Sequence, residues 1–198
     1  MRLSILERGH PPRNRVLLRL MALTSGGEPD DVVKTMLYRP RFFGRAWAAL
    51  TRSAMRGPSP WTPAEREVLG AYVSRRNRTP FCHAIHTRTA SLGLGRRVDD
   101  AVLCDPASSD LDRRVTATLA FLDRAVDGAA TPEDVRRLRD AGVSDAEILD
   151  AVEVCFVFNL VNRLANSLGY TNDGSDGSWR SARALHRMGY KMPSFALR

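Results

Sequence analysis

Helix-start signals recur along the sequence and constrain its fold more than any other feature. A Ser or Thr followed three residues later by an acidic residue, at 62–65, 131–134 and 144–147, matches the capping box that begins an α-helix. Asp30 or Asp31 is expected to cap a further helix. No segment alternates apolar and polar residues as a half-buried strand does. The sequence therefore predicts an all-α fold, a bundle of about eight helices.

The length of 198 residues suits one domain with one hydrophobic core. We expect a single domain over 1–198, in which 1–29 form a peripheral N-terminal helix and 178–198 form a helix and a tail. Three residues of this tail are expected to pack on a neighbouring subunit: Tyr190, Pro193 and Phe195.

The longest predicted helix, 145–168, is apolar on nearly every side over 152–161, so we expect it at the centre of the core. Cys155 within it is expected to be inert packing. A polar stripe near the end of this helix has two open roles, hydrogen bonding to other helices, which is the more common one, and ligand contact: Asn159, Asn162, Arg163 and Asn166.

The formal net charge of +8 comes almost wholly from arginine. These arginines are spread along the chain without a nucleic-acid motif, so we expect a solvated basic surface and no nucleic-acid partner. No apolar run approaches the roughly 20 residues of a membrane span, and Arg19 interrupts the early apolar segment that resembles a signal peptide. The odd number of cysteines, three, argues against a disulfide framework. We expect reduced thiols, a cytoplasmic location and no membrane partner.

The segment 79–86 holds the best candidate for reactivity. Thr79 and Pro80 are expected to cap and begin a helix, and Cys82 and His86 lie four residues apart on one face of it. A thiolate is stabilised near a helix N-terminus and beside an imidazole, so the two residues form a plausible reactive pair. A cysteine and a histidine on one helix face are more often packing residues. Zinc usually takes four ligands in standard paired spacings, which are absent, so we expect no metal.

Glu67 lies on the preceding predicted helix. Glu65 of that helix completes the capping box, whereas Glu67 has no such role in starting the helix. Small residues share its face and would let another helix approach closely: Gly70, Ala71 and Ser74. Glu67 is therefore a candidate site residue. The alternative is a solvent-facing glutamate paired with Arg66 or Arg75.

Together these residues resemble the motif of the alkylhydroperoxidase D-like proteins, within the carboxymuconolactone decarboxylase superfamily. That motif places a glutamate on one helix and a Cys-x-x-Cys-x-x-x-His run at the start of the next. Glu67 corresponds to the glutamate, Cys82 to the second cysteine and His86 to the histidine. The resemblance covers most of the chain from about residue 30 and extends through three further segments: 39–40, 61–67 and 158–169.

Thr79 stands where the motif has its first cysteine, so the disulfide of the family's dithiol cycle cannot form. The resemblance implies a homo-oligomer without a cofactor, in which His86 and Glu67 relay the proton of Cys82. Thr79 could then hydrogen-bond the sulfur of Cys82. His83 could substitute for His86 or compete with it.

Three functions remain open. The leading one is a peroxidase in which Cys82 reduces a hydroperoxide and an external thiol recovers it. The second is a decarboxylase or related proton-transfer enzyme, in which His86 and Glu67 act on an organic acid such as a carboxylated lactone. The third is a non-catalytic or redox-sensing oligomer of the same fold.

Overall fold

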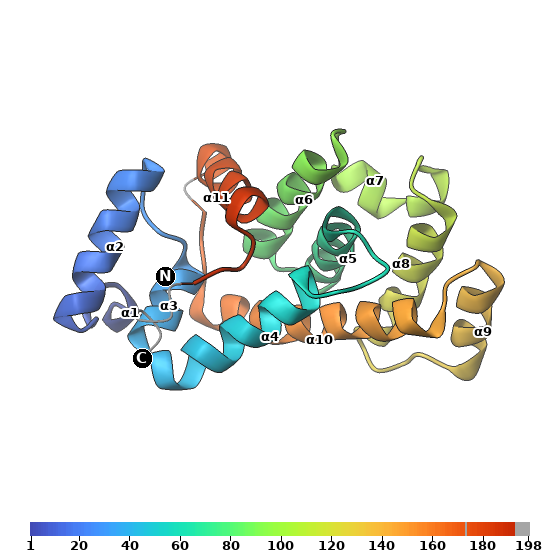
Figure 1. Ribbon diagram of the computed structural model, residues 1–198, viewed down its shortest axis with the longest axis horizontal. Coiled ribbons are helices and arrows are strands. Elements are labelled where there is room, and N and C mark those ends of the chain that lie inside the picture. Colours follow the sequence, from blue (N-terminus) through green and yellow to red (C-terminus); the bar gives the residue numbers. More distant parts are fainter. Residues whose placement is uncertain (173, 193–198) are drawn as a thin grey trace.

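The computed structural model describes residues 1–172 and 174–192, and these residues form eleven α-helices and no strand (Figure 1). The helices are α1 (Ile5–Arg8), α2 (Pro12–Ser25), α3 (Asp31–Tyr38), α4 (Arg45–Arg56), α5 (Pro63–Arg76), α6 (Pro80–Leu94), α7 (Asp100–Cys104), α8 (Arg113–Ala125), α9 (Pro132–Asp140), α10 (Asp145–Leu168) and α11 (Gly174–Met188). The all-α prediction is confirmed. The count exceeds eight partly because a helix such as α1, with four residues, is too short to show an apolar period.

Local capping explains where several helices begin. All three predicted capping boxes are present, Thr62 with Glu65, Thr131 with Asp134 and Ser144 with Glu147. In the first of them, the Thr62 N–H donates to Glu65 Oε2 at 2.7 Å. The boxes fix the starts of α5, α9 and α10.

Two predicted caps are wrong. Thr79 occupies the position before α6, but its hydroxyl donates back to the carbonyl of Asn77 at 3.3 Å and caps nothing. The Asp30 side chain accepts from Ser181 Oγ at 2.6 Å, and the Asp31 side chain accepts from the backbone N–H of Thr171 at 3.0 Å. In each case another partner competes successfully with the local helix N-terminus.

α10 packs against α4, α5, α6, α8 and α9, and it runs horizontally through the lower half of Figure 1. One face of it is buried and includes Val154, Cys155 and Phe158. We expected 152–161 at the centre of the core, and α10 contributes one face to it. The opposite face carries exposed apolar side chains. These exposed residues form the α10 stripe: Leu149, Val152, Phe156 and Leu160.

The polar residues at the end of α10 mainly bond to the end of α5 and the turn after it. Asn77 Nδ2 donates to Asn159 Oδ1 at 2.8 Å, and Ser74 Oγ donates to Asn162 Oδ1 at 3.3 Å. Asn166 Nδ2 donates to the carbonyl of Asn77 at 3.0 Å. These three asparagines therefore have the expected structural role.

Gly70 allows close packing of α10 on α5, one of the two helices of the α5–α6 hairpin that positions the candidate site. Gly70 of α5 faces Phe158 of α10, and a Cβ atom at Gly70 would lie 2.3 Å from Phe158 Cζ. The predicted close approach at the small residues of α5 is therefore confirmed.

The C-terminal segment returns to the α5–α6 hairpin of its own chain. α11 packs beside α6, and Tyr190, two residues after α11, contacts Glu67. Tyr190 therefore packs within its own chain, and packing of the tail on a neighbouring subunit stays a prediction. Pro193 and Phe195 lie outside the described residues. Among the helices of 1–172 and 174–192, none combines the length and the apolarity needed to cross a membrane.

Candidate functional site

Glu67 and His86 form a buried pair across the α5–α6 hairpin. His86 Nδ1 lies 2.6 Å from Glu67 Oε2, a short charge-assisted hydrogen-bond distance. Glu67 is 1% exposed and His86 is 8% exposed. The predicted association of these two residues is present, and the alternative of a solvent-facing Glu67 is wrong.

Arg56, the last residue of α4, binds the other oxygen of the carboxylate. Its Nη2 lies 2.6 Å from Glu67 Oε1. Burial opposes ionisation of Glu67, but the charges and hydrogen bonds of His86 and Arg56 outweigh it and lower the pKa of this carboxyl. Glu67 is therefore an anion held between two basic side chains.

Two aromatic rings enclose the imidazole of His86. The Phe158 ring meets it edge-on, with 4.6 Å between the ring centroids. The Tyr190 ring lies parallel to it, 6.5 Å away. Nδ1 bonds to Glu67, whereas Nε2 makes no hydrogen bond within the described part of the chain. With a proton on Nδ1, Nε2 is the nitrogen that can accept one from a substrate or a thiol.

Cys82 lies one helical turn before His86 in the hydrophobic core and is 2% exposed. No residue of the described segments, Thr79 and His86 included, makes a hydrogen bond to its sulfur. Burial, and after it the nearby charge of Asp30, raise the pKa of the Cys82 thiol. The thiol is therefore protonated at neutral pH in this conformation. Sharing a helix face does not produce a hydrogen bond between Cys82 and His86, whose Nδ1 bonds to Glu67 instead.

His83 lies outside this cluster. Its Nδ1 is 3.2 Å from the carbonyl of Ala71, and its Nε2 is 3.4 Å from Asp100 Oδ1 of α7. It lines a separate cavity of about 860 Å³. The expectation that His83 could substitute for His86 or compete with it therefore finds no support in the geometry.

A cavity of about 690 Å³ opens beside the pair, with Glu67 and Tyr190 in its wall. Neither Cys82 nor His86 is among the described residues that line it. Five basic side chains line it: Arg52, Arg56, His186, Arg187 and Lys191. Within 1–172 and 174–192, Arg52, Arg187 and Lys191 have no carboxylate partner. The cavity can therefore offer uncompensated positive charge to a ligand.

Sequence reasoning missed Arg56, Tyr190 and the carboxyl of Asp30. Arg56 reaches Glu67 across a Gly- and Pro-containing loop, which carries no periodic relation between them. Tyr190 bonds to Glu67 over 123 residues of chain. Gly189, in the left-handed conformation at φ 62°, was the one local sign of a turn before Tyr190.

No arrangement for a metal ion is found: in the described segments, no group of three or more His, Cys, Asp or Glu side chains is placed to hold one.

Comparison with known proteins gives no match to a family model and none to a curated protein sequence. Solved structures do match. An uncharacterized peroxidase-related protein from Silicibacter sp. TM1040 is 22% identical, with a TM-score of 0.72 over 90% of this chain and 95% of that one. The alkylhydroperoxidase AhpD core of an uncharacterized peroxidase-related protein from Ralstonia eutropha JMP134 is 25% identical, with a TM-score of 0.72 over 88% of this chain and 92% of that one. The chain therefore has the helical fold of the alkylhydroperoxidase AhpD core and of peroxidase-related proteins.

Proposed function

We propose that the protein is a peroxidase-related oxidoreductase in which Cys82 reduces a hydroperoxide and the His86–Glu67 pair relays its proton. The observation that carries this proposal is the 2.6 Å contact between Glu67 and His86, on the helix that also holds Cys82 one turn earlier. The similarity to peroxidase-related structures supports the same reaction class.

In the proposed reaction, the Cys82 side chain first comes within reach of His86 Nε2, which takes the thiol proton. Glu67 stabilises the imidazolium that results, as a carboxylate does beside a catalytic histidine. The thiolate then attacks one peroxide oxygen, the O–O bond breaks, and the second oxygen leaves as an alcohol after taking a proton from His86. Cys82 becomes a sulfenic acid.

Recovery of Cys82 requires two equivalents of an external thiol. The first condenses with the sulfenic acid to give a mixed disulfide and water, and the second releases Cys82 and forms the disulfide of the reductant. Thr79 provides no thiol for an internal disulfide. A supply of small thiols is typical of a reducing compartment, so this cycle fits the expected cytoplasmic location.

Trapping of the sulfenic acid tests the proposal. Reduced protein is treated with cumene hydroperoxide and dimedone, adducts are located by mass spectrometry, and peroxide consumption is followed with dithiothreitol as reductant. We expect an adduct on Cys82 and a loss of consumption in Cys82→Ser. Cys104→Ser, which removes an exposed thiol, is the matched control and should retain consumption. Equal consumption by Cys82→Ser and the wild type would overturn the proposal.

The basic cavity favours a second candidate, proton transfer on an organic acid. Its wall contains Glu67 but not, among the described residues, Cys82. Arg52, Arg187 and Lys191 could bind the carboxylate while the His86–Glu67 pair exchanges the proton. Release of CO₂ from carboxylated lactones tests this candidate. Glu67→Gln should lose that activity, whereas Cys82→Ser should retain it, and retention in Cys82→Ser is what separates this reaction from the thiol-dependent one.

The buried, protonated state of Cys82 supports the third possibility, a non-catalytic or redox-sensing protein. Absence of both a Cys82 adduct and CO₂ release would favour it.

We also propose a homo-oligomer, which the exposed α10 stripe supports. Light scattering on the wild type and on Phe156→Asp tests this. A monomeric wild type would refute it.

A further inference from the structure

Tyr190, which follows α11, enters the Glu67–His86 site. α11 ends at Met188, and Gly189 turns the chain by adopting a left-handed conformation with φ 62°. The Gly189 N–H donates to the carbonyl of Leu185 at 2.9 Å, which ties this turn to the last turn of α11. The turn delivers the Tyr190 side chain to Glu67.

Both the hydroxyl and the ring of Tyr190 contact the site. The hydroxyl donates to Glu67 Oε1 at 3.1 Å and lies 3.4 Å from Oε2. The ring is within 7° of parallel to the imidazole of His86, and the Arg56 guanidinium lies 5.0 Å from the ring centroid. Tyr190 therefore lies between the two basic partners of Glu67.

The hydroxyl of Tyr190 is a permanent donor in this position. Burial and the negative charge of Glu67 raise the pKa of Tyr190 well above its ordinary value, so the phenol keeps its proton. Tyr190 and Arg56 both bond to Oε1, which leaves Oε2 directed at His86 Nδ1. Two donors on one oxygen restrict rotation of the carboxylate.

The ring also lies on the cavity side of the pair. Tyr190 and Glu67 line the cavity, whereas His86 is not among its described lining residues. Removal of the ring would therefore bring cavity water closer to the imidazole, and water competes with a buried hydrogen bond.

We propose that Tyr190 is a positioning residue of the Glu67–His86 pair: its hydroxyl fixes the carboxylate against His86, and its ring keeps cavity water from the hydrogen bond. This inference rests on the proposed role of the pair. It assigns a part of the site to a residue that lies 104 positions after His86.

Tyr72 provides a matched control. Its hydroxyl also donates to a carboxylate, Asp123 Oδ1, at 3.0 Å. Tyr72 is a buried residue of α5. Its acceptor, Asp123, belongs to α8 and lies outside the candidate site. A general effect of losing a tyrosine–carboxylate bond should therefore occur in Tyr72→Phe as well.

The experiment follows the Nδ1–H proton of His86 by NMR in the full chain. A proton shared with a buried carboxylate resonates far downfield, and its loss in His86→Gln assigns it. We expect Tyr190→Phe to shift this resonance, because the ring stays and the donor to Oε1 is lost. Tyr190→Ala should speed its exchange with solvent roughly tenfold, the equivalent of about one lost hydrogen bond.

Each outcome decides between the alternatives. An unchanged resonance and exchange rate in both Tyr190 variants would overturn the inference, and so would equal changes in Tyr72→Phe. Thermal unfolding of each variant verifies that the fold is kept, and Tyr190→Phe serves if Tyr190→Ala does not fold. The readout needs no turnover, so an inactive wild type with the expected proton behaviour would refute the proposed reaction and leave the role of Tyr190 standing.

Discussion

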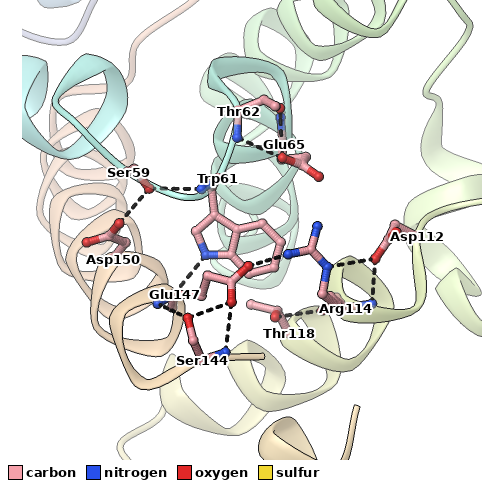
Figure 2. Close-up of polar contacts among 10 residues, drawn as sticks. All are labelled: Ser59, Trp61, Thr62, Glu65, Asp112, Arg114, Thr118, Ser144, Glu147 and Asp150. Carbon is pink, nitrogen blue, oxygen red and sulfur yellow. Dashed lines mark hydrogen bonds and ion pairs between the residues drawn. The ribbon is translucent and has the colours of Figure 1, made fainter. Parts of the chain in front are cut away.

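Glu67 and Glu147 are both buried glutamates paired with an arginine, but they have different kinds of partner. Glu147 is 3% exposed and completes the capping box of α10, where its Oε2 accepts from the N–H and the hydroxyl of Ser144, each at 2.7 Å (Figure 2). Arg114 of α8 binds its other oxygen. The backbone carbonyl of Glu147 also accepts from Trp61 Nε1 at 2.8 Å. This glutamate joins three segments of the fold.

Glu67 has no bond to the start of its own helix. Its partners are side chains from other elements, Arg56, His86 and Tyr190, and it lies in the wall of a cavity. Of the described partners of the two glutamates, His86 is the one with an imidazole, the side chain that most often transfers protons in catalysis. Burial and an arginine partner are therefore common to Glu147 and to Glu67 of the candidate site. An imidazole partner beside a cavity is what distinguishes Glu67.

Removing the charge of Glu67 should have the largest effect on function. We expect Glu67→Gln to lower peroxide consumption by about 10²- to 10⁴-fold, the usual contribution of a general acid–base group. Steady-state consumption with dithiothreitol measures it. Glu147→Gln is the matched control and should stay within about twofold, since Gln preserves the capping box. If the two variants lose activity equally, the distinction between the two glutamates fails.

Removing the side chain of Glu147 should have the largest effect on stability. Glu147→Ala loses the capping box and the bond to Arg114, so we expect the free energy of unfolding to fall by about 2–3 kcal/mol. Glu147→Gln should lose about half as much, because the cap remains. Urea unfolding measures both. A loss below about 0.5 kcal/mol in Glu147→Ala would show that this region is not a structural anchor.

Crowding Gly70 should disturb the Glu67 region and leave the Glu147 region unchanged. In Gly70→Ala the new Cβ meets the Phe158 ring, which also contacts His86. We expect a net stability loss of roughly 1–2 kcal/mol, because the overpacking cost exceeds the gain in helix propensity. Phe158→Leu in the same chain should recover part of this loss. Urea unfolding checks the pair, and a stabilised Gly70→Ala would contradict the close packing.

The smallest expected effect is the pH dependence of stability. The pKa of Glu67 is lowered in the folded chain, so its contribution is present above the ordinary value of 4.5 and is lost as the pH falls through the folded pKa. The pKa of Glu147 is also lowered in the folded chain, so its contribution to stability is lost on acidification in the same way. Between about pH 6 and pH 3, each Glu→Gln variant should therefore lose less stability than the wild type. Urea unfolding at several pH values tests this, and curves parallel to the wild type would contradict it.

The features that the sequence predicted correctly depend on residues that are close together in the chain. The capping boxes at Thr62, Thr131 and Ser144 are complete within four residues, so tertiary contacts were not needed to find them. Glu67 and the small residue Gly70 were recognised because helix geometry places them on one face. The Glu67–His86 pair followed from its resemblance to a known motif.

The features that the sequence did not predict depend on competition between partners. Thr79 had the right position for a cap, but its hydroxyl found a carbonyl in the preceding turn. Cys82 shared a face with His86, but a buried carboxylate is a stronger partner for imidazole than a thiol. Arg56 and Tyr190 approach Glu67 from other elements, and no local period connects them to it.

The contacts of Glu67 differ widely in sequence separation, and this has a consequence for the order of folding. His86 lies 19 positions after Glu67, and Arg56 lies 11 positions before it. Closing such short loops is fast and costs little entropy, so the carboxylate can meet both basic partners once α4, α5 and α6 assemble. Tyr190 joins from 123 positions away, and its contact should form late. The ion pairs of Glu67 with Arg56 and His86 would then exist in a partly folded chain. Tyr190 would cover the pair on its cavity side in one of the last steps of folding.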